Sequence, residues 1–435
     1  MAKKNSSKTK KEFLEKEEWD SACDLEAVSQ LIEETALWAS DIYRKIHMYP
    51  EIGNEEYRTA SLIEACLSEI GLKSRRPLAT SVVAEQCENI ITGNETLTSE
   101  NDGAQQPAVR KRRRIVFRAE LDAIKIQEET ALLHRSCRDG YMHACGHDVH
   151  MAVLLGAAKV FSKIKDLIDI DIKYIFQQDE EGDGKAKVLA ELGEVKETDL
   201  VMGMHVRPSL PAGSIGIKRG MIHGASLMFD ICLSGKKSHG AMPQLGCDAL
   251  AASAAVVSSA YAMSLRCISP AQASLLSFGT ICGGRQRNVI ADEVRLSGII
   301  RGESREMCSR IGEELCCIAE STAAAYHCQA AVELTKGYPP LVNDAEMTEL
   351  VRRAAECCRD SVELVEISEV SLTVDDFAYY LEKGRGAYFY LGSGFRGREN
   401  SDIHTGTFCI DETCIKTGIQ MLVSVVLLLC SQIEK

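Results

Sequence analysis

The sequence predicts an α/β fold in which a mainly parallel-sheet domain is interrupted by a smaller α+β domain. Segments typical of strands and of helices alternate over residues 115–220, as they do where helices cross over between parallel strands. From about residue 226 the order becomes strand, helix, strand, strand, helix, which is typical of a compact α+β unit. At 435 residues the chain is also too long for one ordinary core, so two domains are expected.

We place the boundaries where composition changes. Residues 1–22 are highly charged and are expected to form a flexible segment. The larger domain is expected to take residues 23–222 and 336–435, and the α+β domain residues 223–335. Within the larger domain, 92–114 is polar, rich in turn formers and ends in a basic run, which indicates an exposed basic insertion. A targeting or polyanion-binding role for that run is the less favoured interpretation.

The first elements follow from apolar spacing. Helices are predicted over about 25–48 and 59–70, the first ending before Pro50 and the second at Gly71. The stretch 115–123 begins as a buried strand, and 143–161 changes from a loop into an amphipathic helix.

A second strand is predicted from the alternation over 168–184, followed by a helix of about ten residues and a short strand at 200–205. The α+β domain is then expected to contain the following segments: strands at 229–235, 274–284 and 293–302, and helices around 248–264 and through about 325. After Tyr338 a helix, a strand and a helix should complete the first sheet. The apolar stretch 421–430 is too short to span a bilayer, which needs about 20 apolar residues, and fits a buried C-terminal helix.

Composition excludes several classes of partner. A net charge of −13 disfavours nucleic acid and anionic membrane surfaces, because both attract basic proteins. The N-terminus has no apolar stretch that could form a secretory signal. Eighteen cysteines include no CxxC pair, and adjacent pairs such as Cys316–Cys317 suit helices better than disulfide bridges. Reduced thiols and a cytoplasmic location are therefore expected.

Candidate metal ligands lie at the ends of several predicted elements. Cys145-Gly146-His147 opens a helix, Glu180 and Glu181 follow a strand, His205 closes another, and His404 precedes the last helix. Ligands bind at the carboxyl ends of strands in open parallel sheets, so these groups can converge. Thiolate, imidazole and carboxylate together match zinc, manganese, cobalt or nickel rather than calcium or magnesium. Any one group alone is more often a buried histidine or an acidic turn, but their joint placement predicts a metal centre.

Several longer segments occur in one order along the chain: IHMYPEIGNEEYRT (46–59), FRAELDAIKIQEET (117–130), MHACGHDVHMAVLLGAAK (142–159), YIFQQDEEGDGKA (174–186), MGMHVRPSLPAGSIG (202–216), KKSHGAMPQLGCDAL (236–250), RNVIADE (287–293), DDFAYY (375–380) and HTGTFCIDE (404–412). Over about residues 35–430 the sequence resembles the metal-dependent amidohydrolases that include hippurate hydrolases, N-acyl-amino-acid amidohydrolases and indoleacetyl-amino-acid hydrolases. This family is a branch of a dinuclear metallo-exopeptidase clan.

The resemblance implies two divalent metal ions per subunit, of zinc, manganese, cobalt or nickel. Cys145 would bridge them, and Glu180 would be the general base that takes a proton from the attacking water. The remaining ligands would be His147, Glu181, His205 and His404.

The resemblance also assigns roles to the α+β domain, which would serve as a lid and a homodimerisation module. His239 would stabilise the oxyanion across the dimer. Asn288 and Arg301 are candidates for binding the substrate carboxylate, although a structural role for either is equally open.

Some nearby residues fit supporting roles better. Asp122 and Asp148 are expected to support neighbouring groups or cap a helix, and His150 is a less favoured ligand. Four positions depart from the family pattern without removing a proposed ligand or the base, so activity should survive. They are Glu120 for aspartate, Lys125 for proline, Asp179 for a small residue and Asp375 for glutamate.

The expected function is hydrolysis of the amide bond in N-acyl amino acids or related small conjugates. Deacetylation of a biosynthetic amino acid, hydrolysis of aromatic acyl conjugates, and dipeptidase or carboxypeptidase activity are the open alternatives. An inactive metal-binding scaffold dimer is less favoured, because all six ligand and base positions are filled. The expected partners are the small-molecule substrate and a second copy of the chain, without nucleic acid or membrane.

Overall fold

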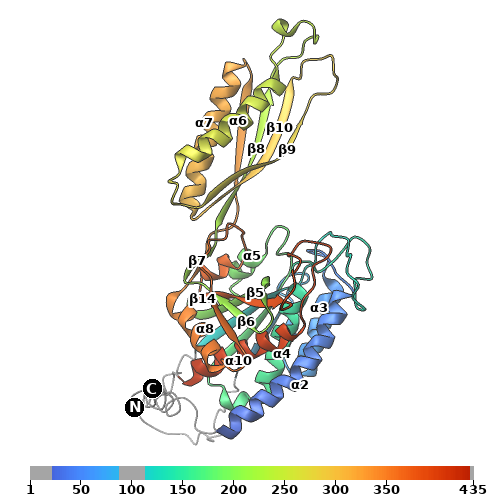
Figure 1. Cartoon of the computed structure of the whole chain (residues 1–435), viewed down its shortest axis with the longest axis vertical. Helices are drawn as coiled ribbons and strands as arrows, with labels where there is room; N and C mark the ends of the chain where they lie inside the picture. Colours follow the sequence, from blue (N-terminus) through green and yellow to red (C-terminus); the bar gives the residue numbers. More distant parts are fainter. Residues whose placement is uncertain (1–21, 88–112, 432–435) are drawn as a thin grey trace, which may run out of the picture. The chain divides into compact units, whose positions relative to one another are not determined.

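The computed structural model describes residues 22–87 and 113–431, so nearly all of the predicted N-terminal segment and of the predicted basic insertion lies outside the described residues. The chain forms two compact units (Figure 1). The larger takes the chain up to Lys218, Asp344–Ile367 and the chain from Glu382; the smaller takes Arg219–Asn343 and Ser368–Leu381. Each unit contains its own hydrophobic core.

The larger unit is built on an eight-stranded sheet. The parallel pairs are β4–β3, β3–β5, β5–β14 and β6–β13. The antiparallel pairs are β1–β2, β2–β4 and β14–β6. This mainly parallel sheet confirms the predicted class. Its strand order is β1 (Ser74–Arg75), β2 (Val82–Gln86), β4 (Asp171–Gln177), β3 (Arg114–Glu120), β5 (Asp199–Pro211), β14 (Arg385–Gly394), β6 (Ser214–Ile217) and β13 (Glu363–Glu366).

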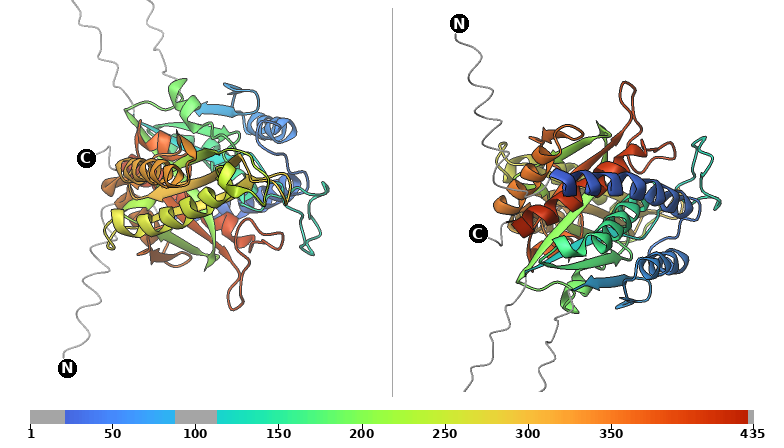
Figure 2. Two further views of the ribbon diagram at one scale, coloured as in Figure 1. Left: turned by 90° about the horizontal axis from the view of Figure 1, so that it is seen from above. Right: turned by 90° about the horizontal axis from the view of Figure 1, so that it is seen from below.

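Three helices of the larger unit pack against α4. This helix lies against β3, β4 and β5 and also contacts α2, α3 and α10. Figure 2 shows α2 and α10 on the same face of the sheet as α4. Almost every side chain from His147 to Phe161 is therefore buried, so the predicted amphipathic character is wrong. The helices are α2 (Ala22–His47), α3 (Tyr57–Glu69), α4 (His147–Lys163), α5 (Ala186–Glu191), α8 (Ala345–Cys357) and α10 (Thr413–Ser431), with a short 3₁₀ turn η1 (Lys165–Leu167).

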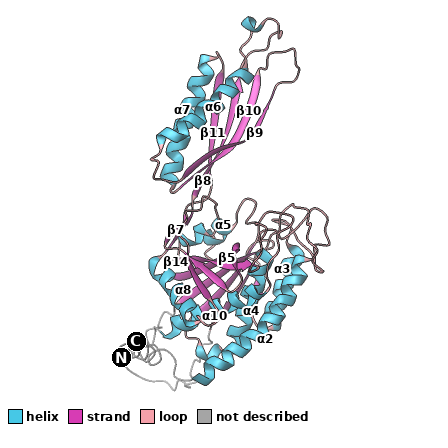
Figure 3. Cartoon of the chain, in the orientation of Figure 1, coloured by secondary structure: helices cyan, strands magenta, loops and turns pink. Residues whose placement is uncertain are grey.

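The smaller unit contains a four-stranded antiparallel sheet in the order β11 (Gln329–Lys336), β8 (Ala225–Ser234), β10 (Glu293–Gly302) and β9 (Ser274–Gly283). Two long helices, α6 (Ala249–Cys267) and α7 (Arg305–Ala325), cover one face of it (Figure 3). Strand β11 was not predicted. The unit also holds the short elements β7 (Gly220–His223), η2 (Pro243–Leu245), β12 (Leu341–Asn343) and α9 (Ala378–Leu381).

Two described helices, α6 and α10, are long and apolar enough to span a bilayer by length and composition alone. Most of α10 is buried in the core of the larger unit, from Cys414 to Leu429. This confirms the predicted buried C-terminal helix, which also extends eight residues before the apolar stretch that begins at Met421.

The parallel strands place the candidate ligands. Asp122 follows the carboxyl end of β3, and Glu180 follows that of β4. His205 lies inside β5 and is paired with Tyr390 of β14. β5 continues to Pro211, so the prediction that His205 closes its strand is wrong, because β14 extends the pairing as far as Gly394.

Candidate metal centre

The structure brings the five predicted metal ligands together in the larger unit. Sγ of Cys145 groups with ring nitrogens of His147 and His205, with all three atoms within 4.8 Å of one another. The same sulfur groups equally closely with Glu181 and His404. Cys145 thus belongs to two separate ligand groups, which is the arrangement that a bridging ligand requires.

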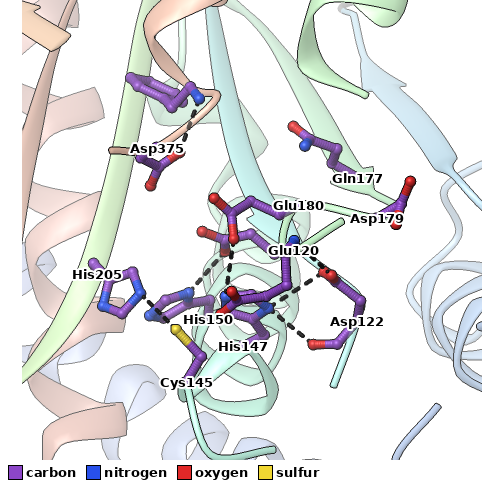
Figure 4. A network of polar contacts seen from close by, with 12 residues as sticks. Glu120, Asp122, Cys145, His147, His150, Gln177, Asp179, Glu180, His205 and Asp375 are labelled. Carbon is purple, nitrogen blue, oxygen red and sulfur yellow. Dashed lines mark hydrogen bonds and ion pairs between the residues drawn. The ribbon is translucent and has the colours of Figure 1, made fainter. Parts of the chain in front are cut away.

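Direct contacts tie these groups together. Sγ of Cys145 lies 3.2 Å from Nε2 of His205, and Nε2 of His404 lies 2.9 Å from Oε1 of Glu181. Figure 4 shows Cys145, His147 and His205 pointing toward one another from the start of α4 and from β5. The contacts among these side chains leave their donor atoms close enough to share a cation.

Local backbone geometry delivers Cys145 and His404. Gly146 has φ +88° immediately before α4, and a Cβ there would lie 2.4 Å from Cγ2 of Val206, so only glycine fits between the two predicted ligands on either side. His404 has φ 60°, and its backbone N–H donates to the carbonyl of Ala144 at 2.8 Å. This bond joins the loop before α10 to the residue preceding Cys145.

Asp122 supports two predicted ligands. Its backbone carbonyl accepts a hydrogen bond from Nδ1 of His147 at 2.9 Å, which leaves Nε2 of that ring directed at the site. Its carboxylate accepts the backbone N–H of Glu181 at 2.9 Å. The supporting role predicted for Asp122 is consistent with both contacts, since ring orientation and ligand basicity are commonly set in this way.

A second, fully buried chain supports His205. Arg118 pairs with Glu120, and Glu120 Oε2 lies 2.7 Å from Nδ1 of His150. Nε2 of His150 accepts the backbone N–H of Val206 at 3.0 Å. Both ring nitrogens of His150 are therefore occupied, which agrees with its rank as a less favoured ligand.

Two of the five predicted ligands, His205 and Glu181, have pKa values that favour the protonation state needed for metal binding. Burial lowers the pKa of His205 to about 3, and His150 adds to this, so the imidazole is neutral. Burial raises the pKa of Glu181, but its hydrogen bond with His404 and the nearby His147 lower it to about 2, so the carboxylate is ionised. Burial raises the pKa of the Cys145 thiol well above its ordinary value. A metal ion bound beside this thiol would displace its proton and so stabilise the thiolate, which is the form that binds metal.

One buried atom indicates that the cluster lacks a partner. Nε2 of His147 makes no hydrogen bond to any described residue, and Oε2 of Glu180 lies 3.9 Å from it. Buried polar atoms are rarely left unsatisfied, so such an atom inside a group of metal-ligating side chains fits a bound ion. The donor set of one sulfur, three imidazole nitrogens and a carboxylate fits divalent transition metals.

The residues predicted in the smaller unit are only partly brought together. His239 pairs with Val289 as an isolated bridge, and Gly240 donates its N–H to the carbonyl of Asn288 at 2.8 Å, so His239 and Asn288 are neighbours. Arg301 lies near the other end of β10, about 26 Å along the strand from Glu293 at the ideal strand rise. Arg301 therefore lies at the opposite end of β10 from the loop that contains Asn288.

Sequence reasoning missed a set of residues that hold the Glu180–Glu181 turn. These are Asn54, Glu56 and Gln178, which contact one another or the backbone at Asp179. No spacing in the sequence links residues 54–56 to 178–179, which are more than 120 positions apart. The segment EIGNEE lay within the family resemblance and was the only signal available.

Comparisons with known proteins agree with this geometry. The family model described as peptidase family M20/M25/M40 matches residues 116–428. N-acetyl-L-cysteine deacetylase of Bacillus subtilis is 34% identical over 375 residues, covering 86% of this chain and 84% of the relative. Thermostable carboxypeptidase 1 of Saccharolobus solfataricus is 32% identical over 402 residues, covering 91% and 96%.

A solved structure shares the fold as well. A dinuclear metal-binding peptidase of the M20 family from Bacillus subtilis superimposes with a TM-score of 0.74 at 26% identity, covering 91% of this chain and 99% of that one. The family model, these relatives and the shared fold establish that the chain belongs to peptidase family M20/M25/M40, a family of hydrolases that act on amide bonds.

Proposed function

We propose that this chain is a dinuclear-metal amidohydrolase that cleaves the amide bond of N-acyl amino acids or related small conjugates. The observation that carries the proposal is the position of Cys145, whose sulfur belongs to two ligand groups at once. Support for the substrate class comes from the relative named N-acetyl-L-cysteine deacetylase, and support for two metals from the dinuclear structural neighbour.

Five side chains would hold the two metal ions. Cys145 would be shared, His147 and His205 would complete one site, and Glu181 and His404 the other. When bound, ions of this type supply a water acidic enough to attack near neutral pH and a positive charge beside the scissile carbonyl. Zinc, manganese, cobalt and nickel all suit the donor set.

Glu180 would be the general base. Its carboxylate lies 3.9 Å from Nε2 of His147, at the edge of the ligand cluster. It is adjacent in sequence to Glu181 but groups only with His147 and Glu181 among the predicted ligands. A carboxylate in this position would take the proton of the attacking water and pass it to the leaving nitrogen.

His239 would stabilise the oxyanion, acting across a homodimer. The ring is exposed on the smaller unit, and its Nδ1 accepts the N–H of Ala241 at 3.1 Å, which leaves an Nε2–H donor for substrate. In the same unit, β9 is an edge strand that pairs only with β10 among the described strands, and apolar side chains are exposed on α6 and β9. They are Leu250, Tyr261, Leu265, Leu275 and Ile281. Such an edge and patch fit an interface with a second copy.

Complementation tests the trans arrangement. Glu180→Gln and His239→Ala homodimers should each be nearly inactive, whereas a mixture refolded together should regain activity, because half of the sites in a heterodimer carry neither change. A mixture as inactive as its components would overturn action across the dimer.

A substrate panel tests the function. The chain, loaded in turn with zinc, manganese, cobalt and nickel, is assayed on N-acetyl-cysteine, other N-acetyl amino acids, hippurate and dipeptides. We expect hydrolysis of at least one N-acyl amino acid, and a loss of about 10²-fold or more in Glu180→Gln, since a general base contributes on this scale.

Two alternative functions have distinct outcomes in the same panel. The relative named thermostable carboxypeptidase favours peptide substrates as the second candidate, and cleavage of dipeptides alone would support it. If the chain binds metal but cleaves no amide, and Glu180→Gln leaves metal binding unchanged, the scaffold interpretation would replace the enzyme.

A further inference from the structure

Asp179 is one of the four departures from the family pattern, and the chemistry described above does not use it. It immediately precedes Glu180 and has φ 55°, a left-handed conformation that few residues other than glycine adopt. Figure 4 shows that the side chains of Asp179 and Glu180 point in different directions, with Glu180 toward His147 and Asp179 away from it. The turn at Asp179 therefore decides where Glu180 points.

Asp179 is 4% exposed, and its carboxylate is packed from several sides. Nδ2 of Asn54 donates to Oδ2 at 2.8 Å, and Nζ of Lys185 lies 3.1 Å from the same oxygen. The other oxygen fills space left by two glycines, because a Cβ on Gly53 or Gly182 would lie 2.0 Å or 2.2 Å from Oδ1. The carboxylate is thus enclosed by the 53–54 loop and by its own turn.

Backbone contacts fix the same turn on both sides of Glu180. The N–H of Asp179 donates to Oε1 of Glu56 at 2.8 Å, and its carbonyl accepts from Gly184 at 3.0 Å. Nε2 of Gln178 donates to Oδ1 of Asn54 at 2.7 Å. Together with the bond from Glu181 to Asp122, these contacts hold the residues before and after Glu180.

We propose that Asp179 is a positioning residue, which with Asn54 and Lys185 clamps the 179–185 turn to the 53–56 loop and so fixes Glu180 and Glu181. The roles of Glu180 and Glu181 rest on the proposed function, while the clamp rests on the contacts alone. The clamp acts through both carboxylates: Glu181 is held for metal binding, and Glu180 is held for proton transfer.

Substitution at Asp179 gives the primary test. In Asp179→Ala we expect kcat to fall about tenfold or more with KM changed by less than about threefold, and metal affinity to weaken about tenfold in chelator competition. Amide hydrogen exchange over residues 180–184 should also become faster. Asp179→Asn keeps an acceptor for Asn54 and tolerates the left-handed backbone, so it should restore most of the loss.

Asp183→Asn is the matched control. Asp183 lies in the same turn, is 88% exposed and contacts the same Lys185 Nζ at 3.4 Å, but it makes no contact with Asn54. It should behave like the wild type in all three measurements. If Asp179→Ala retains kcat and metal affinity within about twofold, or if Asp183→Asn loses as much, the clamp is refuted.

Two further variants keep the test decisive if Asp179→Ala fails to fold. Asn54→Ala and Lys185→Gln each remove a contact with Asp179 at a less buried side chain, and each should lower both kcat and metal affinity. If both variants keep the wild-type kcat and metal affinity, the clamp is likewise refuted. If the wild-type chain cleaves no N-acyl amino acid, the proposed function fails, and metal affinity with amide exchange still decides the clamp.

Discussion

The candidate ligands depend on side chains that contact them without belonging to the ligand groups around Cys145. Asp122 holds His147 and the backbone of Glu181, and Glu120 acts on β5 through His150. The sequence could predict the ligands, because the family resemblance carried them, and it could predict a supporting role for Asp122. It could not predict the chain from Arg118 to Val206, because that chain depends on side-chain packing between neighbouring parallel strands.

Removing the Asp122 carboxylate should weaken metal binding. In Asp122→Asn, the negative charge beside His147 is lost and the bond from the backbone N–H of Glu181 is no longer to a carboxylate, so we expect metal affinity to fall about 10- to 100-fold. Chelator competition measures this. Asp166→Asn, at an exposed position in η1, should have no effect, and an unchanged affinity in Asp122→Asn would contradict the supporting role.

Stability should depend on pH through His47. Burial lowers the pKa of this histidine, but hydrogen bonds with Asp148 and Glu128 outweigh it and raise the pKa to about 9, from 6.5 in a model compound. A folded-state pKa above the unfolded value stabilises the fold fully below pH 6.5, and the contribution is lost as pH rises through 9. Glu128, with its pKa lowered to about 2, keeps its own contribution throughout this window.

The free energy of unfolding should therefore decrease between pH 6.5 and 9, by on the order of 3 kcal/mol for a pKa rise of about 2.5. Urea unfolding at several pH values measures it, and His47→Gln should flatten the profile. A wild-type stability that stays constant across this window would rule out a charged His47.

Among the elements, α4 and α10 determine how the site is supported. α4 begins at His147 and is buried between the sheet and the helices α2 and α10. Apolar spacing predicted both helices, but it could not show that α4 is covered on all sides, because this depends on segments far away in sequence. The edge strand β11 was missed because its apolar face is weak: Ala330, Val332 and Leu334 pack against the core of the smaller unit but stay only half-buried.

Truncating a core side chain on α10 should destabilise the larger unit. Ile419 is fully buried against α4. It packs so closely on Gly156 of that helix that a Cβ added to the glycine would lie 2.4 Å from Cδ1 of Ile419. Ile419→Ala should cost about 2–5 kcal/mol of unfolding free energy. Lys416→Ala, on the same helix, removes only a surface ion pair with Glu33 and should cost at most about 1 kcal/mol. Equal costs would contradict this packing.

At the scale of the whole molecule, the chain has two units with separate cores. The change from alternating strands and helices to an α+β pattern was visible in the sequence. The strand order was not, because β14 is inserted between β5 and β6 although it follows them by more than 160 residues. Long-range pairing of this kind has no local signal.

Separate cores predict separate responses to mutation. Leu315→Ala, in the core of the smaller unit, should accelerate amide exchange over 225–334 and leave α4 and α10 unaffected. Ile419→Ala should have the opposite pattern. Uniform acceleration across the chain in either variant would show that the two units unfold together.

The most direct test of a thiolate-bridged metal pair is the metal content and spectrum of the cobalt-loaded chain, with and without Cys145. The wild type should bind two cobalt ions per chain and show a thiolate-to-cobalt charge-transfer band. Cys145→Ala should lose the band and bind fewer than two ions, because the sulfur is shared. A band that persists in Cys145→Ala, or two ions bound as tightly as in the wild type, would contradict a thiolate-bridged metal pair.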